Sequence, residues 1–560
     1  MRRGVSVVNK NVSSFSILFA LLALLIGTCA VVFPASAQAV PTSNGSITVS
    51  GTVASSYDAY QIFSANVVDG DNDAKIATDL AWANDAARDA VLPVLHSAGM
   101  PNSQTTAQEA AEWLNADSHL TSALSAQLAR SLQSSGAVFV PLNAGTAAEL
   151  PCGYWLIVAD DGVIAQDEAG TAPIMALVGG SAVTVKPKAA TPKVAKHVLE
   201  DSAAAWQKAA DATVGDDLYW RLSATVPAGL AAYDTYAVQF VDTMSAGLDP
   251  SKVAASMRVY VAAGASGGFD AVVCEGGNVS STPAKGWTDI TSQCKVSVEG
   301  DAFTVRTGDL IAALGGADAF TSGARVVAVY NAPLNGACNH GIAKGNPNEV
   351  YLRYPRSPFA DQSGDAGFTR TPSDDACAYT WDLALTKRGS DGDKPLAGAV
   401  LSIADDRGRT LAADGMWDAE GKATVTTGED GRVTVSGVDS GKLEVRELKA
   451  PKGYTAFEGT RSVTVKAEGL DVDQVAAAKP KLTITAESPL RADSADGSTG
   501  SLEASLINTP TGTPPSITTG GFMPSTGDMA MYAAAAAAVA GAALIVVALL
   551  VKRGGGSHKE

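Results

Sequence analysis

Cysteine, histidine and aromatic residues are scarce in this chain of 560 residues. It contains six cysteines and five histidines, and only 6% of its residues are aromatic. No two cysteines have Cys-x-x-Cys spacing, no Cys/His cluster has the spacing of a zinc site, and no His-Glu-x-x-His motif occurs. The chain also lacks a Walker loop and a dinucleotide-binding fingerprint. These absences argue against a metalloenzyme, and we expect neither a metal nor a cofactor.

Positive charge is also limited. The sequence has 41 Lys and Arg against 58 Asp and Glu, which gives a formal net charge of -17 at pH 7. Proteins that bind nucleic acids gain much of their affinity from basic side chains that contact phosphates. The acidic balance therefore argues against nucleic acid as a partner, and it suits a soluble exported protein.

Long apolar runs are confined to the two ends of the chain. The first run, residues 15–33, follows a basic segment at residues 2–10 and precedes an Ala-Ser-Ala site at residues 35–37. This order is typical of a secretory signal peptide. We therefore predict a signal peptide over residues 1–39 and a mature chain outside the cytoplasm.

One of the six cysteines falls within the signal peptide, so five remain in the mature chain. Disulfide bonds are permitted outside the cell. Proximity in the sequence favours two bonds, Cys274 with Cys294 and Cys338 with Cys377, and leaves Cys152 unpaired.

The second apolar run, residues 531–551, is long enough to cross ~30 Å of hydrocarbon as a helix, and a basic tail follows it. Met523-Pro524-Ser525-Thr526-Gly527 stands before the run. This arrangement resembles the cell-wall sorting signal of Gram-positive surface proteins, in which sortase cuts a Leu-Pro-x-Thr-Gly motif between Thr and Gly. The resemblance implies a sorting signal over residues 523–560 that is cut between Thr526 and Gly527, with Met523 in the place of Leu and Pro524 matching the motif.

The residues between these ends divide into three predicted domains. In residues 40–188, strand-like alternation at residues 46–53 and 57–67 precedes helical spacing at residues 74–132, and strand character returns at residues 153–158. The first domain is therefore predicted to be α+β, with a helical insertion in a β-framework. Within the insertion, Thr106 and Glu109 predict a capping box at the start of a helix.

The other two domains are predicted to be β-sandwiches. Residues 189–376 and 377–510 contain short alternating runs that are separated by Gly, Pro, Asp and Ser turns. Residues 511–522 are rich in Thr, Pro and Gly and predict a stalk before the sorting signal. The predicted fold class is mostly β, with tandem immunoglobulin-like sandwiches after a mixed first domain.

The third domain carries a recognisable set of motifs. Residues 383–387, 430–435 and 443–454 closely resemble the CnaB-type domain of Gram-positive pilins, including its E-box (Tyr-x-Leu-x-Glu-Thr-x-Ala-Pro-x-Gly-Tyr). The resemblance implies that Lys387 is the nucleophile, Glu447 the catalytic acid and Asn508 the acceptor of an intramolecular isopeptide bond.

The residue types suit this chemistry. Burial lowers the pKa of a lysine amine and raises that of a carboxyl group, so the amine can attack and the carboxyl can polarise the amide. The bond forms once per molecule, so we expect autocatalytic maturation and not an enzyme with turnover.

The second domain is similar to the isopeptide-forming domain of pilus backbone subunits, through residues 192–196, 237–248 and 345–354. The resemblance implies a second triad of Lys196, Asp242 and Asn348. Two alternatives remain open from the sequence: Lys193 in place of Lys196, and Asn331 or Asn346 in place of Asn348.

Residues 183–188 resemble the pilin motif, whose lysine attacks the sorting-motif Thr of the next subunit while that Thr is bound to sortase. The resemblance implies that Lys188 is the nucleophile in this step.

Together these resemblances imply the backbone subunit of a covalent pilus that is anchored to the cell wall and exposed at the cell surface. The implied partners are pilus-type and housekeeping sortases, identical subunits and peptidoglycan, with tip or base pilins and host surface ligands as further candidates. The alternative is a wall-anchored adhesin or pilus-base subunit that does not polymerise.

Overall fold

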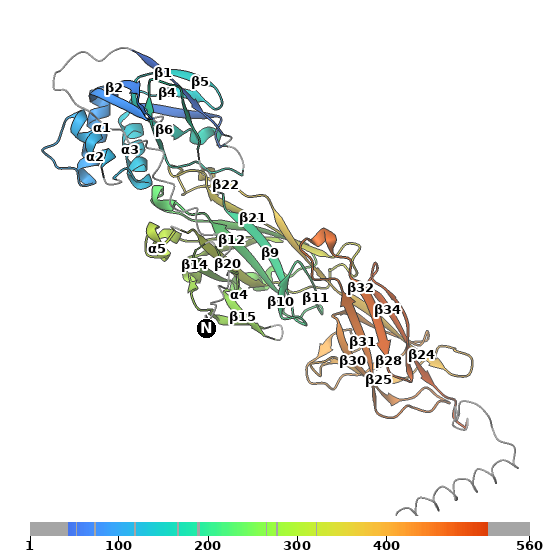
Figure 1. The fold of residues 1–560 in the computed structure, drawn as a ribbon. Coiled ribbons are helices and arrows are strands. Elements are labelled where there is room, and N and C mark those ends of the chain that lie inside the picture. The colour runs from blue at the N-terminus through green and yellow to red at the C-terminus, as the bar shows by residue number, and fades with distance from the viewer. Residues whose placement is uncertain are drawn as a thin grey trace, which may run out of the picture.

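The computed structural model describes residues 43–512, apart from residues 52, 72–73, 117–118, 165–166, 188–190, 265, 276–277 and 321. The predicted signal peptide, Lys188, the sorting residues Met523, Pro524, Thr526 and Gly527, and the apolar run at 531–551 lie outside the described residues. Within the described ranges, no helix has the length and apolar character needed to cross a membrane. The described chain is mostly β and forms three units arranged end to end (Figure 1).

The first unit combines two sheets with three helices. One sheet has the strand order β3-β2-β6-β7 with β4 beside β2, and the other has the order β5-β1-β8. The helices pack on one face of the larger sheet, where Leu95 and Leu128 meet Ile62 and Phe63. The strands are β1 (Asn44–Val49), β2 (Ser56–Asp69), β3 (Lys75–Trp82), β4 (Val140–Asn143), β5 (Ala147–Pro151), β6 (Gly153–Ala159), β7 (Ile174–Val178) and β8 (Val183–Val185), and the helices are α1 (Asp85–Ser97), α2 (Ala107–Asn115) and α3 (Ser122–Ser135).

The predicted helical insertion is present, but its helices begin later in the chain than predicted. Residues 75–82 form strand β3, which pairs antiparallel with β2 and is followed by α1. Pairing with a long neighbouring strand outweighs the local helical preference of this segment. The predicted capping box is confirmed, because Glu109 N donates to Thr106 Oγ1 at 3.2 Å and Thr106 N donates to Glu109 Oε2 at 3.0 Å.

The middle unit is a β-sandwich. Its sheets have the orders β10-β9-β12-β20-β14-β17 and β11-β23-β21-β13-β19-β18, with β22 beside β21. The core between them includes the fully buried side chains of Trp220, Phe240, Phe303 and Tyr330. The strands are β9 (Lys193–Glu200), β10 (Ala205–Gln207), β11 (Ala209–Asp211), β12 (Tyr219–Val226), β13 (Gln239–Met244), β14 (Arg258–Ala263), β15 (Val272–Glu275), β16 (Asn278–Pro283), β17 (Thr288–Asp289), β18 (Lys295–Glu299), β19 (Ala302–Arg306), β20 (Ala324–Asn331), β21 (Asn346–Pro355), β22 (Phe368–Arg370) and β23 (Asp374–Tyr379), and two short helices are α4 (Val253–Ser256) and α5 (Leu310–Ala313).

The third unit is a second sandwich. Its sheets have the orders β29-β24-β34-β33 and β27-β26-β25-β30-β31-β32, with β28 beside β25. Its first strand, β24, runs parallel to its last strand, β34. The strands are β24 (Trp381–Gly389), β25 (Val400–Ala404), β26 (Thr410–Leu411), β27 (Trp417–Asp418), β28 (Val425–Thr426), β29 (Arg432–Val438), β30 (Gly441–Lys449), β31 (Thr460–Glu468), β32 (Lys481–Ala486), β33 (Leu490–Asp496) and β34 (Ser501–Asn508).

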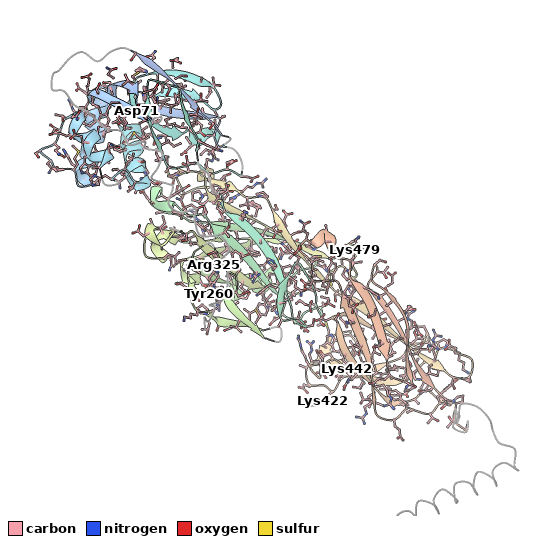
Figure 2. The ribbon with its side chains drawn as sticks, in the orientation of Figure 1. Asp71, Tyr260, Arg325, Lys422, Lys442 and Lys479 are labelled. Carbon is pink, nitrogen blue, oxygen red and sulfur yellow. The ribbon has the colours of Figure 1, made fainter. Side chains whose placement is uncertain are left out.

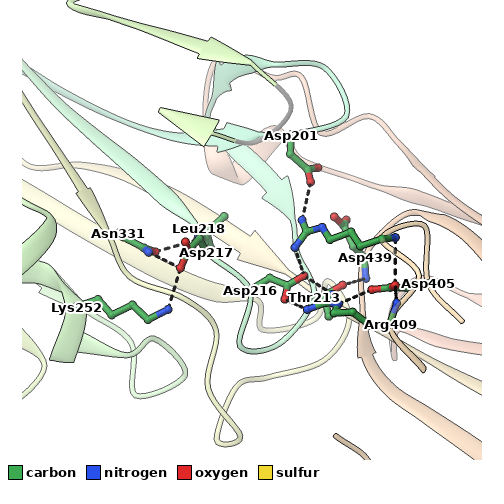
Figure 3. Close-up of polar contacts among 11 residues, drawn as sticks. Asp201, Thr213, Asp216, Asp217, Leu218, Lys252, Asn331, Asp405, Arg409 and Asp439 are labelled. Atoms are coloured by element: carbon green, nitrogen blue, oxygen red, sulfur yellow. Dashed lines mark hydrogen bonds and ion pairs between the residues drawn. The ribbon is translucent and has the colours of Figure 1, made fainter. Parts of the chain in front are cut away.

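The joint between the middle and third units is rich in charged side chains (Figure 3). Arg409 of the third unit donates to Asp216 of the middle unit at 2.8 Å, and Trp381 Nε1 donates to Asp211 Oδ2 at 2.6 Å. Strand β23 crosses the domain boundary expected between residues 376 and 377. The side chains of Ala376 and Ala378 face the core of the middle unit, whereas those of Cys377 and Tyr379 face the core of the third unit. The two sandwiches are therefore joined through shared β-structure and ion pairs.

Several carboxyl groups meet in this joint. Burial, and then the neighbouring Asp211, raise the pKa of Glu200 to about 7. Burial, followed by Asp211 and Asp201, also raises the pKa of Asp439 well above its ordinary value. Because a raised pKa means that the folded state binds more protons than the unfolded state, the contribution of Glu200 and Asp439 to stability is largest at low pH.

We predict that Glu200→Gln reduces the pH dependence of stability. In the wild type, the contribution of Glu200 is fully present below about pH 4.5 and is lost as the pH rises towards about 7. Thermal unfolding at about pH 5 and about pH 8 should show a lower midpoint at the higher pH, and the substitution should narrow this difference. The exposed Glu299→Gln is the matched control. An unchanged difference in Glu200→Gln would contradict the prediction.

Candidate functional site

The core of the third unit contains a lysine, a carboxyl group and an amide. Lys387 lies on β24 and Asn508 ends the parallel strand β34, whereas Glu447 lies on β30 of the facing sheet. Residue exposure is 0% for Lys387, 6% for Glu447 and 2% for Asn508. Each of these residues lies on the inward-facing side of its strand. Leu385 on β24 and Leu506 on β34 face the core in the same way. The strand alternation therefore directs all three polar groups into one apolar core.

Hydrogen bonds orient the three groups. Asn508 Nδ2 donates to Glu447 Oε1 at 2.9 Å and to Oε2 at 3.0 Å, and Lys387 Nζ lies 3.8 Å from Glu447 Oε1. The backbone N–H of Phe457 also donates to Glu447, at 3.1 Å. Lys387 Nζ donates to the carbonyl of Leu506 at 3.1 Å. Asn508 Oδ1 is buried and has no hydrogen-bond partner within the described residues.

The apolar surroundings alter the acidity of the lysine. Burial lowers the pKa of Lys387 to about 8, although the nearby Glu447 acts in the opposite direction. The neutral amine is therefore more populated near physiological pH than in an exposed lysine, and only the neutral amine has the lone pair needed for attack on a carbonyl carbon.

The middle unit contains a second cluster of the same composition. Lys196 on β9, Asp242 on β13 and Asn348 on β21 are each 0% exposed. Lys196 Nζ donates to Asp242 Oδ2. Tyr330 on β20 completes the cluster. Its hydroxyl accepts from Lys196 Nζ at 3.0 Å and from Asn348 Nδ2 at 2.8 Å, and it donates to Asp242 Oδ2 at 3.2 Å.

The sequence alternatives lie elsewhere. Lys193 is exposed. Asn331 Nδ2 donates to Asp217 at 2.6 Å, and its Oδ1 accepts from the backbone N–H of Leu218 at 3.0 Å (Figure 3). Asn346 bonds to Asn339 and to a strand carbonyl. The residues that meet in the core are therefore Lys196, Asp242 and Asn348.

Tyr330 was not foreseen from the sequence. The alternation of β20 signals that its ring faces the core, since Val326 and Ala328 precede it on the same face. The hydrogen-bond partners of its hydroxyl lie on three other strands, and no local sequence pattern predicts these contacts.

Burial also governs the charges of this cluster. It lowers the pKa of Lys196 to about 8 and raises that of Asp242 to about 6, and in each case the other member of the pair opposes the shift. Burial raises the pKa of Tyr330 well above its ordinary value, so the hydroxyl stays protonated. Both shifts of the pair favour the neutral amine beside a neutral carboxyl.

The sequence of the third unit also matches a known protein family. Residues 382–479 match the family model described as SpaA, a prealbumin-like fold domain. The third unit contains a SpaA-type domain. Lys387 and Glu447 lie within the matched residues of the SpaA-type domain, and Asn508 lies beyond them on its last strand.

Curated and solved proteins resemble the chain over different extents. The trypsin-resistant surface T6 protein of Streptococcus pyogenes serotype M6 is 30% identical over 143 residues, which span 24% of this chain and 24% of that protein. The solved T6 backbone pilin of S. pyogenes is 16% identical with a TM-score of 0.45, and the match covers 84% of this chain and 98% of that one. The major pilin SpaD of Corynebacterium diphtheriae is 15% identical with a TM-score of 0.40, covering 85% and 100%.

The five described cysteines are all free, which corrects the predicted disulfide bonds. Cys274 lies on β15 and packs against the cluster around Tyr260 and Val327, whereas Cys294 packs against the middle core. Cys338 belongs to the middle core and Cys377 to the core of the SpaA-type domain. Proximity in the sequence was misleading because each predicted pair is divided between two separate apolar clusters. Among the described residues, no group of three or more His, Cys, Asp or Glu side chains could hold a metal ion.

We predict that all five thiols of the mature chain are detected after denaturation without a reductant. In the folded chain Cys294 and Cys377 should react slowly, because burial raises the pKa of each thiol to about 11 and the thiolate is the reactive form. Counting labelled thiols by mass spectrometry before and after denaturation tests this. Recovery of fewer than five labels from the denatured protein would indicate a disulfide bond.

Proposed function

We propose that this chain is the backbone subunit of a sortase-assembled pilus on a Gram-positive bacterium. The observation that carries the proposal is the pair of buried clusters, one in each sandwich, in which a lysine amine meets a carboxyl group and an asparagine amide. The SpaA-type domain and the partial match to a streptococcal surface protein support it. The sorting motif and the pilin-like motif in the sequence supply the means of polymerisation.

In each cluster the lysine amine attacks the carboxamide carbon and releases ammonia. In the SpaA-type domain, the neutral amine of Lys387 would bond to Asn508 while Glu447 transfers protons between the two nitrogens. Asn508 already donates two hydrogen bonds to Glu447, so the leaving nitrogen lies beside the acid. Water is excluded from the core, so the electrostatic interaction between Glu447 and the amide is not weakened by solvent. The bond forms once, so the protein is a structural component with a single-turnover reaction.

The bond would connect the first and last strands of the SpaA-type domain, β24 and β34. It would close almost the whole domain into a covalent loop. By analogy with the loop entropy of disulfides, such a crosslink stabilises by about 4–5 kcal/mol. A force applied at the two ends of the domain would then load covalent bonds instead of strand hydrogen bonds.

Polymerisation would use a different lysine. Lys188 would attack Thr526 of the next subunit after sortase has cut the bond to Gly527, with Met523 and Pro524 contributing to recognition by the enzyme. Strand β8 ends at Val185, and of the two residues before Lys188, Lys186 is exposed and Pro187 is buried. The last subunit would be transferred to peptidoglycan by a housekeeping sortase. Identical subunits are then the main partners, and tip pilins, base pilins and host ligands are secondary ones.

We predict that the intact mature chain is lighter than its sequence mass by two molecules of ammonia. Lys387→Ala and Lys196→Ala should each restore the mass of one ammonia, because each removes one nucleophile. Lys387→Ala should also lower the free energy of unfolding of the SpaA-type domain by about 4–5 kcal/mol. Intact mass and thermal unfolding are the measurements.

Lys442→Ala is the matched control. Lys442 lies in the same domain on β30, is exposed and pairs with Glu444 at 2.9 Å (Figure 2). Its loss should leave both ammonia deficits unchanged. A wild-type mass equal to the sequence mass would refute both bonds.

We predict that co-expression with a pilus-type sortase produces a ladder of high-mass species that resists boiling in detergent. Lys188→Ala should abolish the ladder, because it removes the acceptor amine of the intersubunit bond. Immunoblots of wall extracts compare the two, and Lys186→Ala, two residues away, serves as the control.

A single monomer-sized band in both strains would contradict the shaft role if the sortase acts on a known substrate in the same cells. That result would favour the alternative of a wall-anchored adhesin or pilus-base subunit. The mass measurement is independent of sortase, so it distinguishes failure of polymerisation from failure of the internal bonds.

A further inference from the structure

The two clusters differ in how the carboxyl group reaches the amide. In the SpaA-type domain, Glu447 accepts directly from Asn508 Nδ2 at 2.9 and 3.0 Å. In the middle unit, no hydrogen bond of the described residues joins Asp242 to Asn348. The Tyr330 hydroxyl lies between them, 3.2 Å from Asp242 Oδ2 and 2.8 Å from Asn348 Nδ2. It also lies 3.0 Å from the attacking nitrogen of Lys196.

We propose that Tyr330 is a catalytic residue of the middle unit, whose hydroxyl carries a proton from Asp242 to the leaving nitrogen of Asn348. This inference rests on the proposed isopeptide reaction and adds a fourth participant to one of its two sites. Tyr330 contacts both nitrogens that change bonding, so its hydroxyl can act on the reaction directly.

The proton transfers balance. The ammonium group of Lys196 passes one proton to Asp242, which leaves a neutral amine and a neutral carboxyl. Nζ attacks Cγ of Asn348, a C–N bond forms, and the carbonyl electron pair moves to Oδ1. Asp242 then gives its proton to the Tyr330 hydroxyl while the hydroxyl gives its own proton to Nδ2.

The last steps restore the tyrosine and release the product. Nζ returns one proton to Asp242 as the carbonyl re-forms and the Cγ–Nδ2 bond breaks. One ammonia leaves, one amide bond is gained, and Asp242 ends as a neutral carboxyl group. Tyr330 ends unchanged, with one proton received and one given.

The surroundings of Tyr330 suit a relay. Its residue exposure is 0%, and the ring packs edge-on against Phe303 at 4.7 Å between centroids, so the hydroxyl has a fixed position. Lys196 Nζ lies 5.6 Å from the ring centroids of both Tyr330 and Trp220, and these rings confine the amine. Burial keeps the phenol neutral, and a neutral hydroxyl can donate and accept at the same time.

The test is Tyr330→Phe in the full chain, made by timed cell-free synthesis and followed by intact mass. The same molecule carries an internal control, because the bond of the SpaA-type domain has no tyrosine between its acid and its amide. Loss of one ammonia should proceed at the wild-type rate, and loss of the second should slow by about 100-fold or more, as removal of a proton-transfer group does. Tyr260→Phe removes a buried hydroxyl that has no partner within the described residues, and it should lose both ammonias normally.

Tyr330→Leu separates proton transfer from packing. A relay requires the Phe and Leu variants to be similarly slow in the middle unit. If the Phe variant forms the bond at the wild-type rate and only the Leu variant fails, the ring matters for packing and the proposal is overturned. A Phe variant whose middle unit is unfolded by amide hydrogen exchange, with Lys196→Ala as the folded and unbonded reference, would also overturn it. A wild-type chain that loses no ammonia would instead refute the isopeptide reaction itself.

Discussion

The burial of a lysine amine between two apolar sheets is the constraint on which both sandwiches depend. A charged ammonium group is costly to remove from water, and the penalty falls when the group is paired or neutral. Lys196 and Lys387 are each 0% exposed, and each has one acidic side chain within reach. Burial therefore lowers the pKa of both lysines and shifts each amine towards its neutral form. Formation of an amide would remove the titratable lysine from the core, so the same penalty that lowers the lysine pKa would favour the reaction.

The strands that carry these residues follow from the architecture. Lys387 lies on the first strand of the third unit and Asn508 on the last, and these strands are neighbours in one sheet. Lys196 lies on the first strand of the middle unit, whereas Asn348 lies on a late strand of the facing sheet. Crosslinks at these places would span most of the chain of each sandwich. The joint between the middle and third units, where the structure describes it, is held by hydrogen bonds and ion pairs, and burial raises the pKa of its carboxyl groups Glu200 and Asp439.

Lys387, Glu447 and Asn508 were predicted from the resemblance to CnaB-type motifs, and the structure brings the three side chains together in one core. Lys387, Glu447 and Asn508 each lie in a short alternating motif, and alternation alone fixes the face on which a side chain lies. The middle cluster was predictable only in part. Lys193 and Lys196 are close in the sequence, and the three candidate asparagines lie on or near strands, so only the contacts of Asn331 and Asn346 remove them from consideration. Residues 75–82 escaped prediction because pairing with β2 decided their structure.

The sequence did not predict the surroundings of the cysteines or the contacts of Tyr330, and the physical reason is the same. Both depend on which side chains meet across separate strands, and sequence distance carries little information about that. The two clusters also differ in how the acid and the amide are arranged. Asp242 and Asn348 lie on neighbouring strands of one sheet, β13 and β21, whereas Glu447 faces Asn508 from the opposite sheet. In the middle unit the hydroxyl of Tyr330 occupies the position between acid and amide. Each cluster therefore contains a continuous hydrogen-bonded path from the carboxyl group to the amide nitrogen, made by a different set of side chains.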